Sequence, residues 1–265
     1  MTGVPTSLSP MCGRYASSRR PEDLVEEFEI DPNAVKETLA PDYNVAPTKE
    51  VYAVVARPPS QDRSLPAQRQ LRVLTWGLIP SWAKDPSIGN RMINARMETV
   101  AEKPAYRKAF AARRCLLPAD GYYEWYATKQ EPGTGKRHRP IKQPFFIRPA
   151  DGGVLAMAGL YEIWRDPTRS EDDPHRFRWT CTVLTTAAED DLGHIHDRMP
   201  LLVEKDRYAA WLDPTVSGPE SLMPLLVPAA PGRLQAYPVS TEVNNVKNNG
   251  PELIEPLATE PAEPA

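Results

Sequence analysis

The chain has 265 residues, of which 41% are hydrophobic and 25% are charged, and its formal net charge is −3. This composition is typical of a globular protein with an ordinary core, and no uninterrupted apolar run approaches the roughly 18 residues of a membrane-spanning helix. The 30 prolines against 14 glycines argue against a long coiled coil or a helical bundle, because proline lacks a backbone N–H and breaks helices.

The ends of the chain and its cysteines indicate a cytoplasmic protein. Residues 1–10 lack the basic and apolar regions of a secretory signal, so we expect an unstructured leader there. Residues 258–265 predict a disordered tail. Cys12, Cys115 and Cys181 are odd in number, far apart and without a CxxC pair. This pattern argues against a disulfide framework or a zinc ribbon and suits a reducing compartment.

Strands dominate the elements that hydrophobic spacing predicts. In chain order, we expect a helix over 21–28, strands over 51–56 and 71–76, a helix around 106–110, strands over 122–126, 145–148, 154–161 and 177–183, and a helix around 208–212. Residues 57–70, 129–143 and 165–176 carry proline and charge without periodicity and predict exposed loops. The sequence therefore predicts a single α+β domain, rich in antiparallel strands, with short helices around the outside.

Positive charge is concentrated in two segments. Residues 91–114 contain seven basic and two acidic residues, and residues 129–148 contain six basic and one acidic residue, so each has a net charge of +5. A basic run is more often a solvated surface than a binding site, so charge alone does not decide between the two.

Met11 and Cys12 predict unusual chemistry if the working protein begins at Cys12. An amino-terminal cysteine has an α-amine of pKa about 7.7–8.0 beside a thiol of pKa about 8.5. Such a 1,2-aminothiol condenses with an aldehyde to an imine, which the thiol closes into a ring, and the amine can also act as the base for the thiol. The alternative is an internal cysteine in a chain that keeps residues 1–10.

Two histidines, His194 and His196, are spaced i, i+2 within residues 193–200. Histidine is the side chain best suited to proton transfer near neutral pH. The pair could chelate a metal ion, but no cysteine or acidic residue stands at metal-ligand spacing, so no metal site is predicted. A structural role for His194 stays open.

A carboxylate lies among aromatic residues in residues 120–126. Alternation along a strand puts Tyr122, Glu124 and Tyr126 on one face, where the pKa of the carboxyl is expected to be raised enough for general acid or base catalysis. The alternative is an exposed glutamate on a strand.

Asn94 and Arg96 offer an uncharged donor and acceptor and a rigid guanidinium for phosphate. Trp76 and Trp82 flank a proline turn. Most tryptophan pairs lie in a core, but tryptophans exposed beside arginines would stack unpaired bases, each worth roughly 1–3 kcal/mol.

Six motifs occur in one order: MCGRY, YNVAP, WGLIPSW, NARMET, CLLPADGYYEW and HDRMP. Each is weak alone, but together they make the chain, from about Cys12 to Trp211, resemble the SRAP (SOS-response-associated peptidase) family of abasic-site-processing proteins. The resemblance implies a barrel-like antiparallel core with peripheral short helices over residues 12–257, preceded by a leader of residues 1–11.

Members of this family bind single-stranded DNA and trap abasic sites as a thiazolidine on an amino-terminal cysteine. The resemblance implies that Cys12 is the nucleophile, that Asn94 positions the amine and the opened sugar, that Glu124 relays protons, and that His196 opens the deoxyribose ring. It also implies autopeptidase and abasic-site lyase activity, with no metal or organic cofactor. The implied DNA contacts are Arg14, Asn44, Pro47, Trp76, Arg96 and Arg198.

The expected partner is single-stranded DNA that contains abasic sites, bound by a monomer in the cytoplasm, associated with the nucleoid if the source is bacterial. No membrane partner is expected, and replication-fork partners are not specified. Two other functions stay open: an amino-terminal-nucleophile hydrolase or amidotransferase, since class II glutamine amidotransferases also begin Met-Cys-Gly, and a non-catalytic single-stranded DNA-binding protein. The family pattern begins with Met-Cys, whereas ten residues precede Met11 here. The ring chemistry therefore requires either that translation starts at Met11, so that residues 1–10 are untranslated, or that residues 1–11 are removed.

Overall fold

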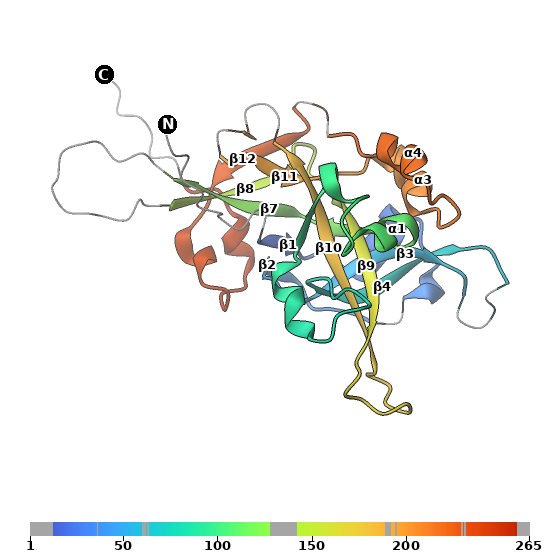
Figure 1. Cartoon of the computed structure of the whole chain (residues 1–265). Helices are drawn as coiled ribbons and strands as arrows, with labels where there is room; N and C mark the ends of the chain where they lie inside the picture. Colours follow the sequence, from blue (N-terminus) through green and yellow to red (C-terminus); the bar gives the residue numbers. More distant parts are fainter. Residues whose placement is uncertain are drawn as a thin grey trace, which may run out of the picture.

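The computed structural model describes residues 13–35, 37–59, 62, 64–127, 142–188, 192–193, 195–228, 230 and 232–258. The strands are β1 (Tyr15–Ser17), β2 (Asp42–Val45), β3 (Glu50–Arg57), β4 (Gln68–Trp76), β5 (Asn94–Arg96), β6 (Arg114–Ala119), β7 (Gly121–Ala127), β8 (Lys142–Pro149), β9 (Leu155–Arg165), β10 (Phe177–Ala187), β11 (Arg198–Pro200) and β12 (Leu234–Pro238). The α-helices are α1 (Pro21–Glu27), α2 (Arg107–Ala112), α3 (Tyr208–Leu212) and α4 (Pro219–Leu222). Figure 1 shows the strands crossing in the middle of the molecule, with α1, α3 and α4 on one side of them.

Five strands close into a barrel. They follow the order β10-β4-β3-β6-β9, and β9 pairs again with β10 to complete the ring. The neighbours are antiparallel except β4 and β10, which run parallel. Two short strands then flank the last residues of β10: β5 runs parallel to it and β11 antiparallel. The hairpin between β9 and β10 projects from the bottom of the barrel in Figure 1.

A second sheet covers one end of the barrel. Its strands follow the order β12-β8-β7-β1-β2, and all neighbours are antiparallel. On one face, Tyr15, Tyr122 and Ile147 join the apolar interior of the barrel. On the other face, Tyr123 and Phe146 pack under the C-terminal 3₁₀ turns η7 (Thr241–Asn244) and η8 (Pro251–Ile254).

Alternation along the barrel strands produces two cores. In β3, Val51, Ala53 and Val55 face the barrel interior, whereas Tyr52 and Val54 face outward. The outward side chains pack against buried residues of the four α-helices, among them Leu24, Phe28, Ala109, Phe110, Tyr208, Trp211, Leu212 and Leu222. Both faces of these strands are therefore apolar, which explains why residues 51–56 form an uninterrupted hydrophobic run.

The α+β fold, the barrel-like core and all the predicted helices and strands are confirmed, with shifted ends. The loops predicted over 57–70 and 129–143 were too long. Residues 68–70 belong to β4, where they pair with β3, and residues 142–143 belong to β8, where they pair with β7. Among the described residues, Cys181 of β10 and Cys115 of β6 are buried free thiols.

Several short strands were not predicted: β1, β2, β5, β6, β11 and β12. Strands of three to six residues carry too little periodicity to be recognised. The leader over 1–11 and most of the tail over 258–265 lie outside the described residues. Within the described part of the chain, no helix is long and apolar enough to cross a membrane.

Candidate functional site

The last residues of β10 bring two distant segments together. Asn94 and Arg96 of β5 align with Val183 and Thr185 on one side of β10. Arg198 of β11 aligns with Ala187 on the other side. The NARMET and HDRMP motifs, about 100 residues apart in sequence, therefore meet at one end of one strand.

Arg198 is fixed by a bidentate ion pair. Its Nη1 and Nη2 atoms donate to Glu98 Oε1 at 2.6 Å and Oε2 at 3.0 Å, and Nη2 also donates to the Thr185 carbonyl at 2.7 Å. The Arg198 side chain is 12% exposed, whereas the Glu98 side chain is 47% exposed. The hydrogen bond from Arg198 lowers the pKa of Glu98, so this carboxyl is ionised at neutral pH.

His196 is held by the strand that follows it. Its Nδ1 accepts from the backbone N–H of Arg198 at 3.0 Å, which leaves the proton of a neutral ring on Nε2. When the ring is protonated, Asp197 Oδ1 at 3.2 Å and the Arg198 carbonyl at 3.3 Å lie within reach of Nδ1. Nδ1 therefore has a partner in either protonation state, as an acid–base residue requires.

Glu124 lies on the inner face of β7. The predicted alternation is confirmed: Tyr122 and Tyr126 pack with the barrel-interior cluster, while Tyr123 packs on the opposite face. The Glu124 side chain is buried at 3% exposure, and across the strand pair it faces Phe145. The alternative of an exposed strand glutamate is therefore wrong.

Chain neighbours of three candidate residues belong to one apolar cluster. Ile93 precedes Asn94, Ile195 precedes His196, and both isoleucines pack in the cluster that receives Tyr122. Strand β1 enters the same region. Tyr15 pairs with Tyr122, and the Tyr123 N–H donates to the Arg14 carbonyl at 2.9 Å.

The same register places Gly13 opposite Glu124. Cys12, the residue before Gly13, lies outside the described residues, as does His194.

Asn44 is internal, and the half-buried Arg14 packs against it. Asn44 is completely buried, and its Oδ1 accepts from Arg14 Nη1 at 2.6 Å. Burial lowers the pKa of the half-buried Arg14 guanidinium, which also lies over the Trp125 ring at 5.8 Å. Pro47 is half-buried in the turn after β2. As the structure stands, Asn44 cannot contact DNA, because its amide is fully used inside the protein.

The two tryptophans of WGLIPSW have opposite environments. Trp76 is fully buried, its Nε1 donates to the Ile93 carbonyl at 2.9 Å, and its ring meets Tyr15 edge-on. Trp82 is 58% exposed. The expected stacking surface on Trp76 is therefore absent from this structure, and Trp82 is the exposed ring of the motif. Sequence reasoning could not separate them, since both flank the same turn.

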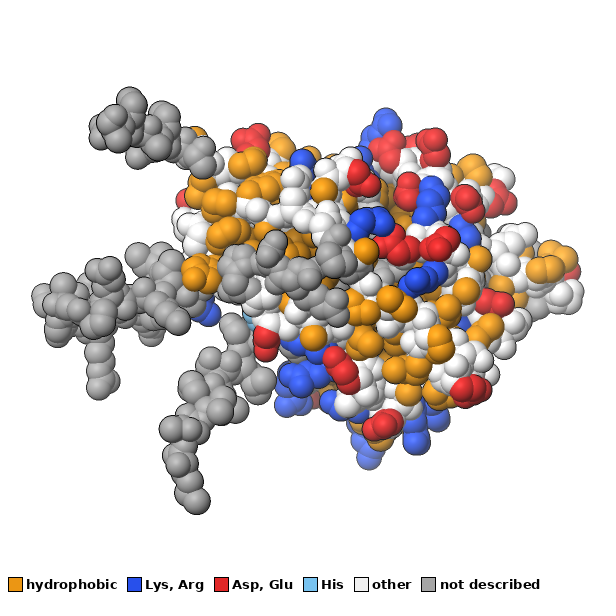
Figure 2. Space-filling view, turned by 90° about the horizontal axis from the view of Figure 1, so that it is seen from above, with side chains coloured by type: hydrophobic (Ala, Val, Ile, Leu, Met, Phe, Trp, Pro, Cys, Tyr) orange, Lys and Arg blue, Asp and Glu red, His pale blue; other side chains and the backbone are white. Residues whose placement is uncertain are grey.

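Part of the first basic segment is structural. Arg114 is buried and donates to the carbonyls of Phe110 and Trp211, and Arg113 pairs with Glu162 at 2.8 Å. The exposed cations of this segment are Arg91, Arg96, Lys103, Arg107 and Lys108. Figure 2 shows Lys and Arg side chains gathered along the lower edge of one face of the molecule. Most of the second basic segment lies outside the described residues.

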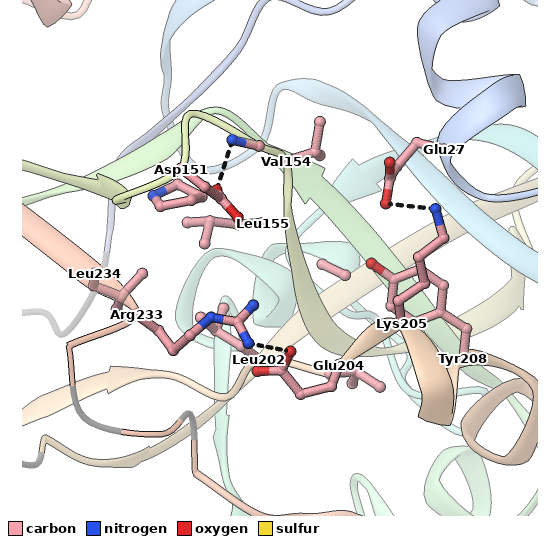
Figure 3. A pocket seen from close by; sticks show the side chains of 14 residues that line it. Glu27, Asp151, Val154, Leu155, Leu202, Glu204, Lys205, Tyr208, Arg233 and Leu234 are labelled. Carbon is pink, nitrogen blue, oxygen red and sulfur yellow. Dashed lines mark hydrogen bonds and ion pairs between the residues drawn. The ribbon is translucent and has the colours of Figure 1, made fainter.

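A separate cleft of about 270 Å³ lies away from these residues (Figure 3). Its two cations already have partners: Lys205 pairs with Glu27 at 3.5 Å and Arg233 with Glu204 at 2.9 Å. None of the predicted site residues lines it. Among the described residues, no group of three or more His, Cys, Asp or Glu side chains could hold a metal ion.

Comparison with known proteins places the chain in a family. The model of the SOS response associated peptidase (SRAP) family matches residues 11–246. Abasic site processing protein YoqW of Bacillus subtilis is 40% identical over 245 residues, covering 92% of this chain and 99% of the relative. Abasic site processing protein YedK of Escherichia coli is 34% identical over 252 residues, covering 93% of this chain and 100% of the relative. HMCES of Gallus gallus, also named an abasic site processing protein, is 32% identical over 240 residues, covering 82% of this chain and 66% of the relative.

Solved structures share the fold. A crystal structure of a protein from Bacteroides thetaiotaomicron aligns with a TM-score of 0.71 at 22% identity, covering 93% of this chain and all of that one. A crystal structure of a phage-related protein from Bordetella bronchiseptica aligns with a TM-score of 0.62 at 28% identity, covering 86% of this chain and 94% of that one.

Proposed function

Because the chain belongs to the SOS response associated peptidase (SRAP) family, we propose that it binds single-stranded DNA and processes abasic sites by forming a covalent crosslink. The nucleophile is Cys12, exposed as the amino-terminal residue after hydrolysis of the Met11–Cys12 peptide bond. The observation that supports this proposal is that chain neighbours of Asn94, Glu124 and His196 share one apolar cluster, with Gly13 of the amino-terminal segment opposite Glu124.

The electrophile is the aldehyde of the opened deoxyribose. In the closed sugar, C1′ carries a hydroxyl group and is bonded to the ring oxygen. The protonated His196 ring donates its Nε2 proton to the ring oxygen as the bond to C1′ breaks, and the C1′ hydroxyl passes its proton to water, which leaves the aldehyde. Asp197 Oδ1 and the Arg198 carbonyl lie within reach of the proton that stays on Nδ1.

The Cys12 amine then attacks the aldehyde carbon. The resulting carbinolamine loses its hydroxyl as water and becomes an imine, and Glu124 carries the protons from the amine to the departing hydroxyl. The thiol adds across the C=N bond, so that sulfur bonds to carbon and the thiol proton goes to nitrogen. This closes a five-membered thiazolidine. Asn94 holds the amine and the sugar with its uncharged donor and acceptor.

Arg96 and Arg198 supply phosphate affinity at the same end of β10, and the exposed Trp82 offers a ring for base stacking. Trapping at the imine stage without ring closure would also permit cleavage of the DNA strand by elimination, which accounts for lyase activity. Autopeptidase activity accounts for removal of residues 1–11.

The test is a denaturing gel after incubation with a single-stranded oligonucleotide that contains one abasic site. We expect a shifted band for the protein that begins at Cys12. The band should be absent for Cys12→Ala and for a variant in which residues 1–11 cannot be removed. Mass spectrometry of the crosslinking protein should find Cys12 at the amino terminus, and an intact leader on crosslinked protein would contradict the mechanism.

The same samples separate the two alternatives. Binding without a shifted band favours a non-catalytic DNA-binding protein, and release of glutamate from glutamine favours an amidotransferase-type hydrolase.

A further inference from the structure

The main phosphate-binding candidate of this site is already occupied in the free protein. Three N–H groups of Arg198 are engaged: one on each Nη atom with the Glu98 carboxylate, and a second on Nη2 with the Thr185 carbonyl. Arg198 Nε is buried and has no hydrogen-bond partner among the described residues. One N–H on Nη1 is therefore all that Arg198 could offer a ligand without rearrangement.

The bidentate, end-on geometry of this pair, through Nη1 and Nη2, is also one in which arginine binds a phosphate. A carboxylate and a phosphate each present two oxygens to the two outer nitrogens of the guanidinium, so the two anions compete for the same face. Because Arg198 is 12% exposed and Glu98 is 47% exposed, an approaching strand first meets the carboxylate. A phosphate reaches Arg198 bidentately only by displacing Glu98.

Glu98 is able to move away. It lies in the single 3₁₀ turn η3 (Met97–Thr99), and Arg198 is its ion-pair partner in the part of the chain that the structure describes. Arg198, in contrast, is anchored by the Thr185 carbonyl on the central strand β10. Exchange of anions therefore leaves the arginine in place and releases the carboxylate toward solvent.

We propose that Glu98 is a specificity-determining residue that occupies the phosphate position on Arg198 until a single strand displaces it. This inference rests on the proposed function, because it takes Arg198 to be a DNA contact. A strand that binds through other contacts as well, such as Arg96 and Trp82, displaces the carboxylate, whereas a weakly held polyanion does not. Glu98 thus lowers the affinity for incidental nucleic acid at this position.

The experiment measures binding without the covalent step. A fluorescently labelled single-stranded oligonucleotide with no abasic site is titrated with the protein that begins at Cys12, and anisotropy is recorded over a series of salt concentrations. Glu98→Gln keeps the side-chain shape and removes the charge. We expect it to tighten binding about 3- to 10-fold and to steepen the dependence of log K on log salt by about one, since Arg198 then gains a phosphate without losing an ion pair.

Glu102→Gln is the matched control, because Glu102 is an exposed acid four residues away with no ion pair in the described part of the chain. It should change affinity by less than twofold. In an Arg198→Ala background, Glu98→Gln should change the affinity for the oligonucleotide by no more than Glu102→Gln does. Thermal unfolding of each variant checks that the fold is kept.

Each other outcome overturns the proposal. Weaker binding by Glu98→Gln would make Glu98 a residue that orients Arg198 for DNA. If Glu98→Gln and Glu102→Gln change the affinity equally, Glu98 acts only through its general surface charge. The same conclusion follows if Glu98→Gln still tightens binding in the Arg198→Ala background.

The two proposals can fail separately. Failure of the parent protein to bind the oligonucleotide would overturn both. A missing abasic-site crosslink together with the expected affinity pattern would overturn only the proposed covalent chemistry.

Discussion

Arg14 Nη1 and Asn44 Nδ2 donate to one and the same acceptor, the carbonyl oxygen of Val243, at 2.8 Å and 3.3 Å. Asn44 Nδ2 also lies within hydrogen-bond distance of the carbonyls of Asn245 and Asn248, at 3.0 Å and 2.9 Å. The start of β1, strand β2 and the C-terminal segment are thus joined at one buried amide. Since Arg14 follows Cys12 by two residues, this junction fixes where the amino-terminal segment enters the site.

Asn44→Ala should therefore destabilise the protein. The substitution leaves several buried carbonyls and the Arg14 guanidinium without this partner, and we expect the free energy of unfolding to fall by about 2–4 kcal/mol. Denaturant unfolding measures it. Asn90→Ala, at an exposed asparagine, is the control and should change stability by less than about 0.5 kcal/mol. A stability loss no larger than the control's would show that the junction contributes little.

The tryptophans of WGLIPSW should respond in opposite ways to substitution. Trp82→Ala should weaken binding to a single-stranded oligonucleotide by roughly 1–3 kcal/mol through lost stacking, with unfolding unchanged. Trp76→Ala should lower the free energy of unfolding by about 3–5 kcal/mol, because Trp76 fills the barrel interior. Anisotropy and thermal unfolding on both variants provide the comparison. Normal DNA affinity for Trp82→Ala would remove this ring from the binding surface.

Arg96→Ala and Arg198→Ala should both weaken DNA binding and reduce its salt dependence. Loss of the Arg96 contact should lower the slope of log K against log salt by about one, whereas loss of Arg198 should lower it by less, because the Arg198–phosphate contact replaces the ion pair with Glu98. Arg198→Ala should be the more severe, since it also leaves the Glu98 carboxylate without its partner beside the strand. Titrations between 50 and about 200 mM salt, the range in which such contacts differ most, measure both effects. Affinities equal to the parent protein's across this range would contradict the assignment.

Substitution of His196 should slow crosslinking and leave DNA affinity near normal. His196→Asn can keep an acceptor where Nδ1 receives the Arg198 N–H, and it removes Nε2. General acid catalysis typically contributes 10²- to 10⁴-fold, so we expect a fall of at least about 10²-fold in the rate of crosslink formation. Single-turnover gels measure this rate. His196→Asn and His196→Ala should be equally slow, and a parent-like rate for either would exclude His196 from the mechanism.

Glu124→Gln should affect the reaction and not the fold. The amide has nearly the shape of the buried carboxyl but does not relay protons, so crosslinking should slow by about 10²-fold or more. The melting temperature should be unchanged or higher, because an uncharged group is less costly to bury than a carboxylate. Glu50→Gln, at the exposed first residue of β3, is the control. A normal rate for Glu124→Gln would assign Glu124 a structural role only.

The sequence by itself identified the candidate catalytic residues and determined the elements with strong periodicity. Glu124 could be placed on one face with Tyr122 because strand alternation is a local property of consecutive residues. Strand β10 was predicted from the same alternation, and β3 from its short run of β-branched residues. The six motifs and their order also sufficed to indicate the family, because motif order is read from the sequence and does not depend on which motifs touch in the fold.

Tertiary structure alone decided which of these residues meet and which are free to bind. Local sequence does not encode that β5 and β11 flank β10, because strands of three residues are set by pairing with other strands and not by their own periodicity. It could not distinguish buried Trp76 from exposed Trp82, or a DNA-contacting Asn44 from a buried junction. The ion pair between Arg198 and Glu98, 100 residues apart, forms because β11 and β5 both pair with the end of β10. The sequence gives the type of each side chain, but long-range packing decides whether that side chain is exposed and which residues it contacts.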